Sequence, residues 1–396
     1  MVTAAGKALA RYALRCTALV GLSALLLAAP ARWGAWALSA LSPHLAVVSS
    51  VALRSVGLMA ACSVPMIVLT AWRRRWFCRY LCPVGLIAET CGRAGLLRKL
   101  EYAKLPPVGQ WLALASLGGA IVGWPLFLWL DPLSIFSGAA GALGGPLTVA
   151  GAVPAVGLAG VVALSFVAPG LWCARLCPLG GTQELLAGLK QRIARAGRPE
   201  GGSRQTGARL ARRSVLCAGA GAACALAIPR LFRASPPKLR PPGAAEEMRF
   251  KALCVRCGNC RRACPSGIIH RDLGGEASSF LTPVVRFPPE RPGQRYCLET
   301  CHNCIQSCPT GALERLTLEQ KNRRPIGLAV VDVSECLVTA DKTCAICVDV
   351  CPREAISLAF CEETYTNTVR IDPSRCNGCG ACVVVCPVDV VTITAL

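Results

Sequence analysis

Charged side chains are scarce in this chain of 396 residues. Only 16% of its residues are Asp, Glu, Lys or Arg, 53% are hydrophobic, and the mean hydropathy is +0.47. This composition is too apolar for an ordinary soluble protein, so it predicts a membrane protein. Histidine is scarcer still, with three residues, and the chain has no Cys-x-x-Cys-His motif. The missing motif and the shortage of axial ligands both argue against haem.

Acidic residues are also few, and their shortage is confined to one part of the chain. Asp and Glu number 22 against 43 Lys and Arg, which gives a net charge of +21. Residues 1–232 contain 23 basic and 5 acidic residues, whereas residues 233–396 contain 20 and 17. The arginines of the first part stand in short blocks between apolar runs. This arrangement is typical of the positive-inside bias of membrane proteins and does not resemble a nucleic-acid-binding patch.

About five transmembrane helices are expected in residues 1–232, because an apolar run of about 20 residues spans a bilayer. The first run is short and has two interpretations, a cleaved signal peptide or an uncleaved helix, of which we favour the helix. The arginines at 73–75 place the C-terminal end of the second run in the cytoplasm. Residues 131–146 lack Lys and Arg and are therefore expected outside the cytoplasm. The runs are residues 16–29, 51–72, 111–130, 147–168 and 214–232.

The sequence predicts three domains: a transmembrane helical domain over 1–232, a proline-rich linker over 233–249, and a cluster-binding domain over 250–396. Alternation of the helices places the last domain on the periplasmic side of the inner membrane. Residues 211–216 resemble a twin-arginine export signal, which suits a domain exported with its cofactors. The same arginine pair is equally compatible with an anchor at a helix end.

Four cysteine runs in the last third of the chain each end in Cys-Pro. The first and fourth have the spacing C-x₂-C-x₂-C-x₃-C-P, which is the bacterial ferredoxin signature for a [4Fe–4S] cluster. Zinc ribbons and disulfides are the alternatives, but zinc knuckles use paired cysteines and not triplets closed by Cys-Pro. The expected ligands of four clusters are Cys254, Cys257, Cys260 and Cys264; Cys297, Cys301, Cys304 and Cys308; Cys336, Cys344, Cys347 and Cys351; and Cys376, Cys379, Cys382 and Cys386.

Two runs depart from the signature. Three residues separate Cys297 from Cys301, and seven separate Cys336 from Cys344, which makes Cys336 the least certain ligand. Short apolar segments follow each run, so we expect loop, short helix and strand in each unit, and an α+β ferredoxin-like fold with duplicated units. Spacing leaves the pairing of the runs open: first with second and third with fourth, or first with fourth around second with third.

A second cysteine motif, C-x₃-C-P, occurs twice in the first part of the chain. Its cysteines are Cys78 and Cys82 in one copy and Cys173 and Cys177 in the other. Cysteines at i and i+4 share one face of a helix, so four thiolates can meet across the repeat. They are candidates for a further metal centre or cluster or for redox-active dithiols; the alternative is that they are small buried residues. The six remaining cysteines are expected to serve packing.

Quinol oxidation would need a proton acceptor beside an apolar slot. His44 and Asp131 are the candidates, expected at the outer ends of the second and third helices, where such a residue is more often a solvated cap. Glu89 and Glu184, which recur behind the C-x₃-C-P motifs, are alternative proton carriers or helix caps.

The two C-x₃-C-P motifs make the first part resemble the NapH family of quinol-oxidising membrane proteins, with NosR and MauN as relatives. The twin-arginine-like segment and the four cluster motifs resemble the periplasmic NapG/MauM ferredoxins. A fusion of the two families is the interpretation that follows. One departure is that NapH-like proteins usually carry cytoplasmic ferredoxin motifs after the last helix, and residues 178–211 contain none.

The resemblance implies a membrane quinol dehydrogenase that takes electrons from the quinone pool. They would pass through four [4Fe–4S] clusters to a periplasmic cytochrome or terminal reductase, such as one of the nitrate-reductase type. Two alternatives remain open: an accessory protein that supplies electrons to mature a periplasmic metalloenzyme, without quinol turnover, and electron flow outward from a cytoplasmic donor. The expected partners are the quinone pool, the lipid bilayer and the acceptor, and no nucleic acid.

Overall fold

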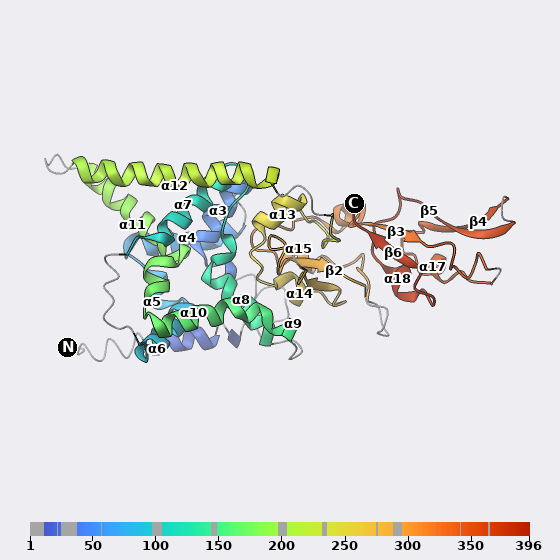
Figure 1. Cartoon of the computed structure of the whole chain (residues 1–396), viewed down its shortest axis with the longest axis horizontal. Coiled ribbons are helices and arrows are strands. Elements are labelled where there is room, and N and C mark those ends of the chain that lie inside the picture. The colour runs from blue at the N-terminus through green and yellow to red at the C-terminus, as the bar shows by residue number, and fades with distance from the viewer. Residues whose placement is uncertain are drawn as a thin grey trace. The chain divides into compact units, whose positions relative to one another are not determined.

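The computed structural model describes residues 12–21, 23–24, 38–56, 58–96, 105–143, 149–196, 204–231, 236–274, 276–287, 295–340, 342–362 and 365–396. Its chain forms two compact units. The first comprises Met1–Arg233, Met248–Gly258 and Pro309–Ala312, and the second Ala234–Glu247, Asn259–Cys308 and Leu313–Leu396. The first unit is helical and the second contains small sheets (Figure 1).

The first unit is built from many short helices. Residues 12–21 are helical and precede the labelled elements. In chain order these are α3 (Pro43–Leu53), α4 (Leu58–Trp72), α5 (Trp76–Tyr80), α6 (Pro83–Arg93), α7 (Val108–Ile121), η2 (Leu128–Leu130), α8 (Pro132–Leu143), α9 (Val149–Ala152), η3 (Val153–Ala155), α10 (Val156–Val167), the π-helical turn η4 (Trp172–Leu176), α11 (Pro178–Ala196) and α12 (Arg204–Leu231).

The predicted transmembrane bundle is wrong. Within the described ranges, no helix combines the length and the apolar character that crossing a membrane requires. Helices α4, α7 and α10 contain 15, 14 and 12 residues. At about 1.5 Å per residue they reach about 18–23 Å, against a hydrocarbon core of about 30 Å. Parts of the predicted runs, residues 22, 25–29, 57, 147–148 and 232, lie outside the described residues.

Local breaks explain why three of the long apolar runs became short helices, whereas the run at 214–232 lies largely within the 28-residue helix α12. Helix α3 ends at Arg54, whose φ of 52° is left-handed. Helix α7 ends before Gly123, which has φ of 93°. Pro154 stands in the 3₁₀ turn that separates α9 from α10. Each break turns the chain where composition alone predicts a continuous helix.

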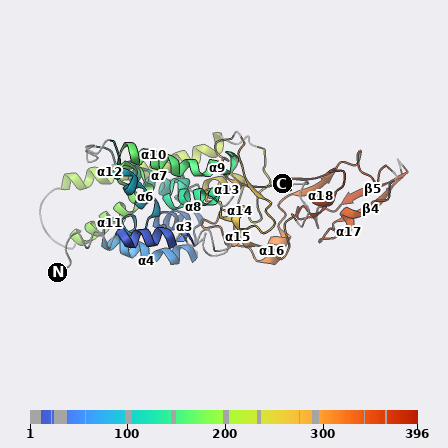
Figure 2. The ribbon, with the colours of Figure 1, turned by 90° about the horizontal axis from the view of Figure 1, so that it is seen from below.

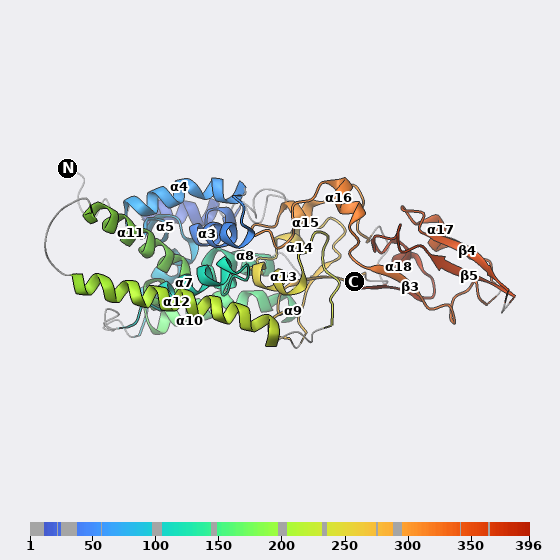
Figure 3. The same ribbon diagram turned by 90° about the horizontal axis from the view of Figure 1, so that it is seen from above.

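Helix α7 is the centre of the first unit, where it contacts α3, α11 and α12 (Figure 3). Glycines allow the close approach of α7 to α12. A Cβ at Gly118 would overlap the carbonyl oxygen of Ala218, and one at Gly221 would overlap that of Ala115. Helices α3 and α4 also pack side by side (Figure 2). This packing brings α3 and α11 together, and these two helices carry much of the candidate site described below.

After α12 the helices are short and the strands form three antiparallel pairs: β1 with β2, β3 with β6, and β4 with β5. Pairing of β3 with β6 joins the segment before the third cysteine run to the segment after the fourth, so these runs belong to one unit. The elements are α13 (Glu247–Leu253), α14 (Asn259–Ala263), β1 (Ile269–Arg271), β2 (Pro283–Val285), α15 (Asn303–Gln306), α16 (Leu318–Arg323), β3 (Leu328–Val331), α17 (Ile346–Asp349), β4 (Ile356–Cys361), β5 (Thr366–Ile371), α18 (Ala381–Val385) and β6 (Val391–Thr394).

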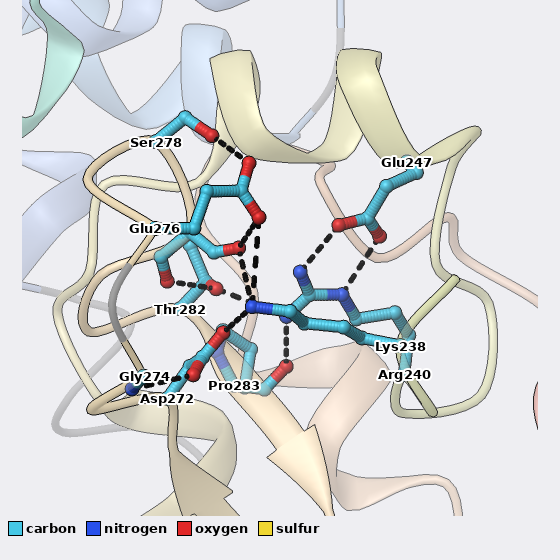
Figure 4. Close-up of polar contacts among 10 residues, drawn as sticks. Lys238, Arg240, Glu247, Asp272, Gly274, Glu276, Ser278, Thr282 and Pro283 are labelled. Atoms are coloured by element: carbon cyan, nitrogen blue, oxygen red, sulfur yellow. Dashed lines mark hydrogen bonds and ion pairs between the residues drawn. The ribbon is translucent and has the colours of Figure 1, made fainter. Parts of the chain in front are cut away.

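Two basic residues anchor the proline-rich segment to the second unit (Figure 4). The Lys238 ammonium lies 2.5 Å from an Asp272 carboxylate oxygen and donates to Ser279 Oγ at 3.0 Å. Arg240 is only 6% exposed and donates to both oxygens of Glu247, at 2.8 and 2.6 Å. It also donates to the Thr282 hydroxyl and the Pro283 carbonyl. Each of these donor groups therefore has an acceptor.

Removing the Arg240 guanidinium should destabilise the second unit. The change Arg240→Ala leaves the Glu247 carboxylate and the Thr282 and Pro283 oxygens without their donor, which we expect to cost about 3 kcal/mol. The measurement is thermal unfolding of the cluster-loaded protein. Arg323→Ala is the matched control, because the Arg323–Glu319 pair is exposed (76% and 74%) and should cost about 0.5 kcal/mol or less. Equal shifts for both variants would contradict the anchoring role of Arg240.

Candidate functional site

Two small cavities in the second unit are each lined by four of the predicted cluster cysteines. One cavity has three cysteines of the third run and the last of the fourth: Cys336, Cys344, Cys347 and Cys386. The other has three of the fourth run and the last of the third: Cys376, Cys379, Cys382 and Cys351. The two runs thus exchange their Cys-Pro cysteines, as in two-cluster ferredoxins, whose fourth cysteine binds the other cluster.

The second run follows the same rule. Cys304 lies within electrostatic reach of Cys297, Cys301 and Cys264, so the last cysteine of the first run joins the first three of the second. The pairing that the sequence left open is therefore first with second and third with fourth. By the same exchange Cys308 is left for the first run, with Cys254, Cys257 and Cys260, and this set stays a prediction.

Backbone and side-chain donors reach the cluster cysteines. Cys308 Sγ accepts the backbone N–H of Leu313 at 3.4 Å, and Cys351 Sγ accepts that of Ala355 at 3.3 Å. The Lys321 ammonium, only 5% exposed, donates to the Leu298 carbonyl at 2.5 Å and favours the thiolate of Cys297. Sequence reasoning missed Lys321, because it stands 13 residues after the nearest cysteine run. Such donors compensate sulfur charge in a buried site.

One hydrogen bond joins the first pair of cysteine runs to the second pair. The backbone N–H of Cys297 donates to the carbonyl oxygen of Cys379 at 2.8 Å. Cys297 belongs to the set with Cys264, and Cys379 lines the cavity with Cys351. Burial raises the pKa of Cys379 to about 11, with further contributions from Cys351 and Cys297. The two sets are therefore direct neighbours within the second unit.

The C-x₃-C-P cysteines lie together in the first unit. Cys82 and Cys177 belong to one buried cluster, and Cys78 and Cys173 lie within electrostatic reach of both. The copies fold alike: φ and ψ are −68° and 116° at Cys82 and −67° and 120° at Cys177, each followed by a helix that starts with proline. Burial raises the pKa of all four thiols, to about 12 for Cys78, so a metal must displace their protons.

The glutamates that recur behind these motifs are ion-paired. Arg15 pairs with Glu89, and Arg75 Nη2 lies 2.7 Å from Glu184 Oε1. Gln110 also donates to Glu184, at 2.5 Å. With these partners, Glu89 and Glu184 are better explained as groups that balance charge beside the cysteines than as free proton carriers.

His44 is fully buried and does not lie at a solvated helix end. Its Nδ1 lies 2.9 Å from Thr182 Oγ1, whose own proton is donated to the Pro178 carbonyl at 2.9 Å. The hydroxyl must therefore accept from His44, so Nδ1 carries the proton and Nε2 presents a lone pair. Among the described residues Nε2 has no hydrogen-bond partner. Burial lowers the pKa of His44 to about 4, which keeps the ring neutral at pH 7.

Asp131 is also fully buried and begins α8. Its Oδ1 accepts the backbone N–H groups of Leu133 at 3.0 Å and Ser134 at 3.3 Å, and its Oδ2 accepts the Ser42 hydroxyl at 2.7 Å. Burial raises its pKa to about 6, against the effect of these hydrogen bonds. The helix cap expected as an alternative is present, but it is a buried one close to the cysteine site: Asp131 adds to the electrostatics of Cys78 and Cys82.

Gln183 is a further residue that sequence reasoning missed. Its Nε2 donates to Cys78 Sγ at 3.0 Å. The signal was present in the repeat: Thr182 and Gln183 stand where the first copy has Ile87 and Ala88. A polar pair that occurs in only one copy of the repeat indicates that this copy makes a contact that the other copy does not make.

Two family models match the chain. A model described as a 4Fe-4S dicluster domain matches residues 253–312 and 342–390, and a 4Fe-4S binding domain matches residues 56–101 and 150–195. The ferredoxin-type protein NapG of Escherichia coli (strain K12) is 35% identical over 220 residues, which cover 52% of this chain and 89% of NapG. The chain belongs to the family of NapG ferredoxin-type proteins. No solved structure matches it.

Proteins named methylamine utilization ferredoxin-type protein MauM are further relatives. That of Methylophilus methylotrophus is 38% identical over 156 residues, covering 36% of this chain and 64% of MauM, so the match spans just under two thirds of that relative. That of Methylorubrum extorquens is 34% identical over 177 residues, covering 41% and 74%. The prediction of an iron–sulfur electron-transfer protein of the NapG/MauM type is confirmed. The resemblance of the first part to NapH stays a prediction.

The cysteines of the matched dicluster domain are the residues that would hold iron–sulfur clusters in this chain. Within the described part of the chain, no three His, Cys, Asp or Glu side chains are placed to hold a single metal ion. The thiolates of a cubane each bind a different iron and stand further apart than the ligands of one ion. The four cysteines of each cavity match the four thiolates that a [4Fe–4S] cluster requires.

Because the third and fourth runs exchange cysteines, substitutions in different runs should abolish the same cluster. Cys351→Ala and Cys382→Ala should abolish the same cluster, because both residues line one cavity. Cys347→Ala should abolish a different one. The measurements are iron analysis and low-temperature EPR of the dithionite-reduced protein. In each variant about four irons should be lost or should bind in an altered form. If Cys351→Ala instead matched Cys347→Ala, ligation within a single run would be the correct pattern.

Proposed function

We propose that this NapG-type protein oxidises quinol and passes the electrons one at a time through four [4Fe–4S] clusters to a periplasmic acceptor, a cytochrome or a terminal reductase. Quinol gives up two electrons and two protons in becoming quinone. The clusters take the electrons, and protein groups near the quinol take the protons. The membrane quinone pool is the donor in this proposal.

The observation that carries the proposal is the bond between Cys297 and Cys379. It links one cluster of the first pair to one cluster of the second through a single peptide hydrogen bond. The cysteine exchange then supports one linear order, in which these two clusters are the inner pair. The set with Cys308 stands at one end and the set with Cys386 at the other. A linear order gives the protein an inlet and an outlet.

The periplasmic location rests on residues 211–216, which resemble a twin-arginine export signal and lie within α12. Export by that route suits a protein that acquires its clusters before it leaves the cytoplasm. The location and the acceptor are proposals.

His44 and Asp131 support proton transfer from quinol. The bare Nε2 of His44 is suited to accept a quinol hydroxyl. The Asp131 carboxylate, with its pKa raised to about 6, is a base matched to neutral pH. Ser42 binds Asp131 and stands two residues before His44, so α3 holds both groups in one region.

Quinol should reduce the clusters within the time of turnover. The test is anaerobic addition of menaquinol to the full-length, cluster-loaded protein, followed by rapid freezing and low-temperature EPR. We expect the signals of reduced [4Fe–4S] clusters. Clusters that stay oxidised with quinol while dithionite reduces them would rule out quinol oxidation and favour the accessory role, in which the chain supplies electrons for maturing a periplasmic metalloenzyme.

Replacing Asp131 should slow that reduction without unfolding the chain. Asparagine remains a good helix cap but cannot take a proton, so we expect Asp131→Asn to lower the rate about 100-fold. In the unmodified protein the rate should rise as pH increases through about 6, because only the ionised carboxylate accepts a proton, and Asp131→Asn should remove this rise. Asp332→Asn is the control, since Asp332 is an exposed loop residue with a similar turn contact to Ser334. An unchanged rate and pH profile in Asp131→Asn would exclude Asp131 as the base.

A further inference from the structure

The two C-x₃-C-P copies cannot each hold a [4Fe–4S] cluster. A cubane takes four protein ligands. The second matched segment, residues 150–195, contains only Cys173 and Cys177. The first contains Cys78 and Cys82 together with Cys62 and Cys91. Cys62 is exposed on α4, and Cys91 stands on α6, nine residues or more than two turns after Cys82.

The fold brings the two incomplete sets together. Cys82 and Cys177 pack in one buried cluster with Phe77, Val84 and Leu179. Gln183, six residues after Cys177, donates to Cys78 Sγ at 3.0 Å, and Arg75, three residues before Cys78, donates to the carbonyl of Ala174, next to Cys173. Four cysteines from two duplicated segments therefore converge on one place in the first unit. We propose that Cys78, Cys82, Cys173 and Cys177 hold a single fifth [4Fe–4S] cluster, shared by the two copies.

Three of the four sulfurs already have N–H donors. Cys82 accepts from the Gly85 backbone at 3.3 Å, and Cys177 accepts from the Gly180 backbone at 3.5 Å. Cys78 accepts from the Gln183 side chain. Cys308 and Cys351, the Cys-Pro cysteines of the ferredoxin part, accept backbone N–H groups in the same way. Donors of this kind stabilise cluster thiolates and tune their potential.

Two arginines supply positive charge where a cluster with four thiolates would be anionic. Arg75 donates to the Ala174 carbonyl at 2.8 Å, inside the second motif, and lies 2.7 Å from Glu184. Arg15 is only 4% exposed and pairs with Glu89. Each arginine is thus already paired with a glutamate, so it offsets only part of the cost of burying an anion here.

The four cysteines resemble the ferredoxin cysteines in one further respect. In the portion of the chain that the structure describes, neither set is grouped closely enough to hold a single metal ion. For the ferredoxin cysteines the family of the chain supports cluster binding. The inference is independent of quinol oxidation and adds a redox centre to the first unit.

The first test is metal content of the full-length protein purified without oxygen. We expect about 20 irons and matching sulfide in the unmodified chain, of which about four belong to the fifth cluster. Cys82→Ala and Cys177→Ala should each lower the content to about 16, and the double variant should lose no more. Cys62→Ala and Cys91→Ala are the matched controls and should keep about 20. A content of about 16 in the unmodified chain, or one zinc in place of the extra irons, would overturn the proposal.

The second test asks whether one cluster is shared. Mössbauer spectra should lose the same component in Cys82→Ala as in Cys177→Ala, although the residues stand in different copies. Additive losses in the double variant would mean separate centres and would overturn sharing. The EPR signals of the ferredoxin clusters should persist in both variants, which shows that the chain is folded. Loss of those signals from the unmodified protein would instead refute the four-cluster chain, so the two failures are distinguishable.

Discussion

A [4Fe–4S] cluster requires four thiolates, and this chain draws them from two segments each time the structure allows the ligands to be traced. In the second unit, three cysteines come from one run and the fourth from its partner. This requirement explains the pairing of β3 with β6, because the segments before the third run and after the fourth must meet. Loops with this little apolar surface gain much of their stability from the metal that they bind, so cluster insertion and folding are one process.

The sequence could single out the cysteines as candidate ligands, because ligand spacing within a tight loop is a local property; their roles as ligands stay a prediction. It left the pairing of the runs open, because pairing depends on which strands meet across a long stretch of chain. Cys336 illustrates the difference. Seven residues separate it from Cys344, which put its role in doubt, yet the fold brings it into the cavity with Cys344 and Cys347. The longer loop changes the path of the chain between Cys336 and Cys344, but Cys336 still lines the same cavity.

The membrane prediction failed because composition counts apolar residues and not the length of the helices they form. Breaks at Arg54, Gly123 and Pro154 divide three of the apolar runs, and the resulting helices bury one face against one another while side chains such as Val64 and Val156 stay exposed. The same packing explains why His44 and Asp131 are buried where helix ends on a surface were expected. Contacts such as Gln183 with Cys78 and Lys321 with Leu298 join distant parts of the chain, and no local pattern encodes them.

The duplicated motifs in the two parts of the chain share a contact to the cysteine that precedes proline. In both, a Cys-Pro cysteine accepts a backbone N–H from the residues that follow, as Cys82 and Cys351 do. In the ferredoxin part a duplicated run has four cysteines, so two runs hold two clusters. A C-x₃-C-P copy has two, so by the same arithmetic two copies hold one. A single C-x₃-C-P copy would give a cluster only two protein ligands, so the proposed fifth cluster requires both copies.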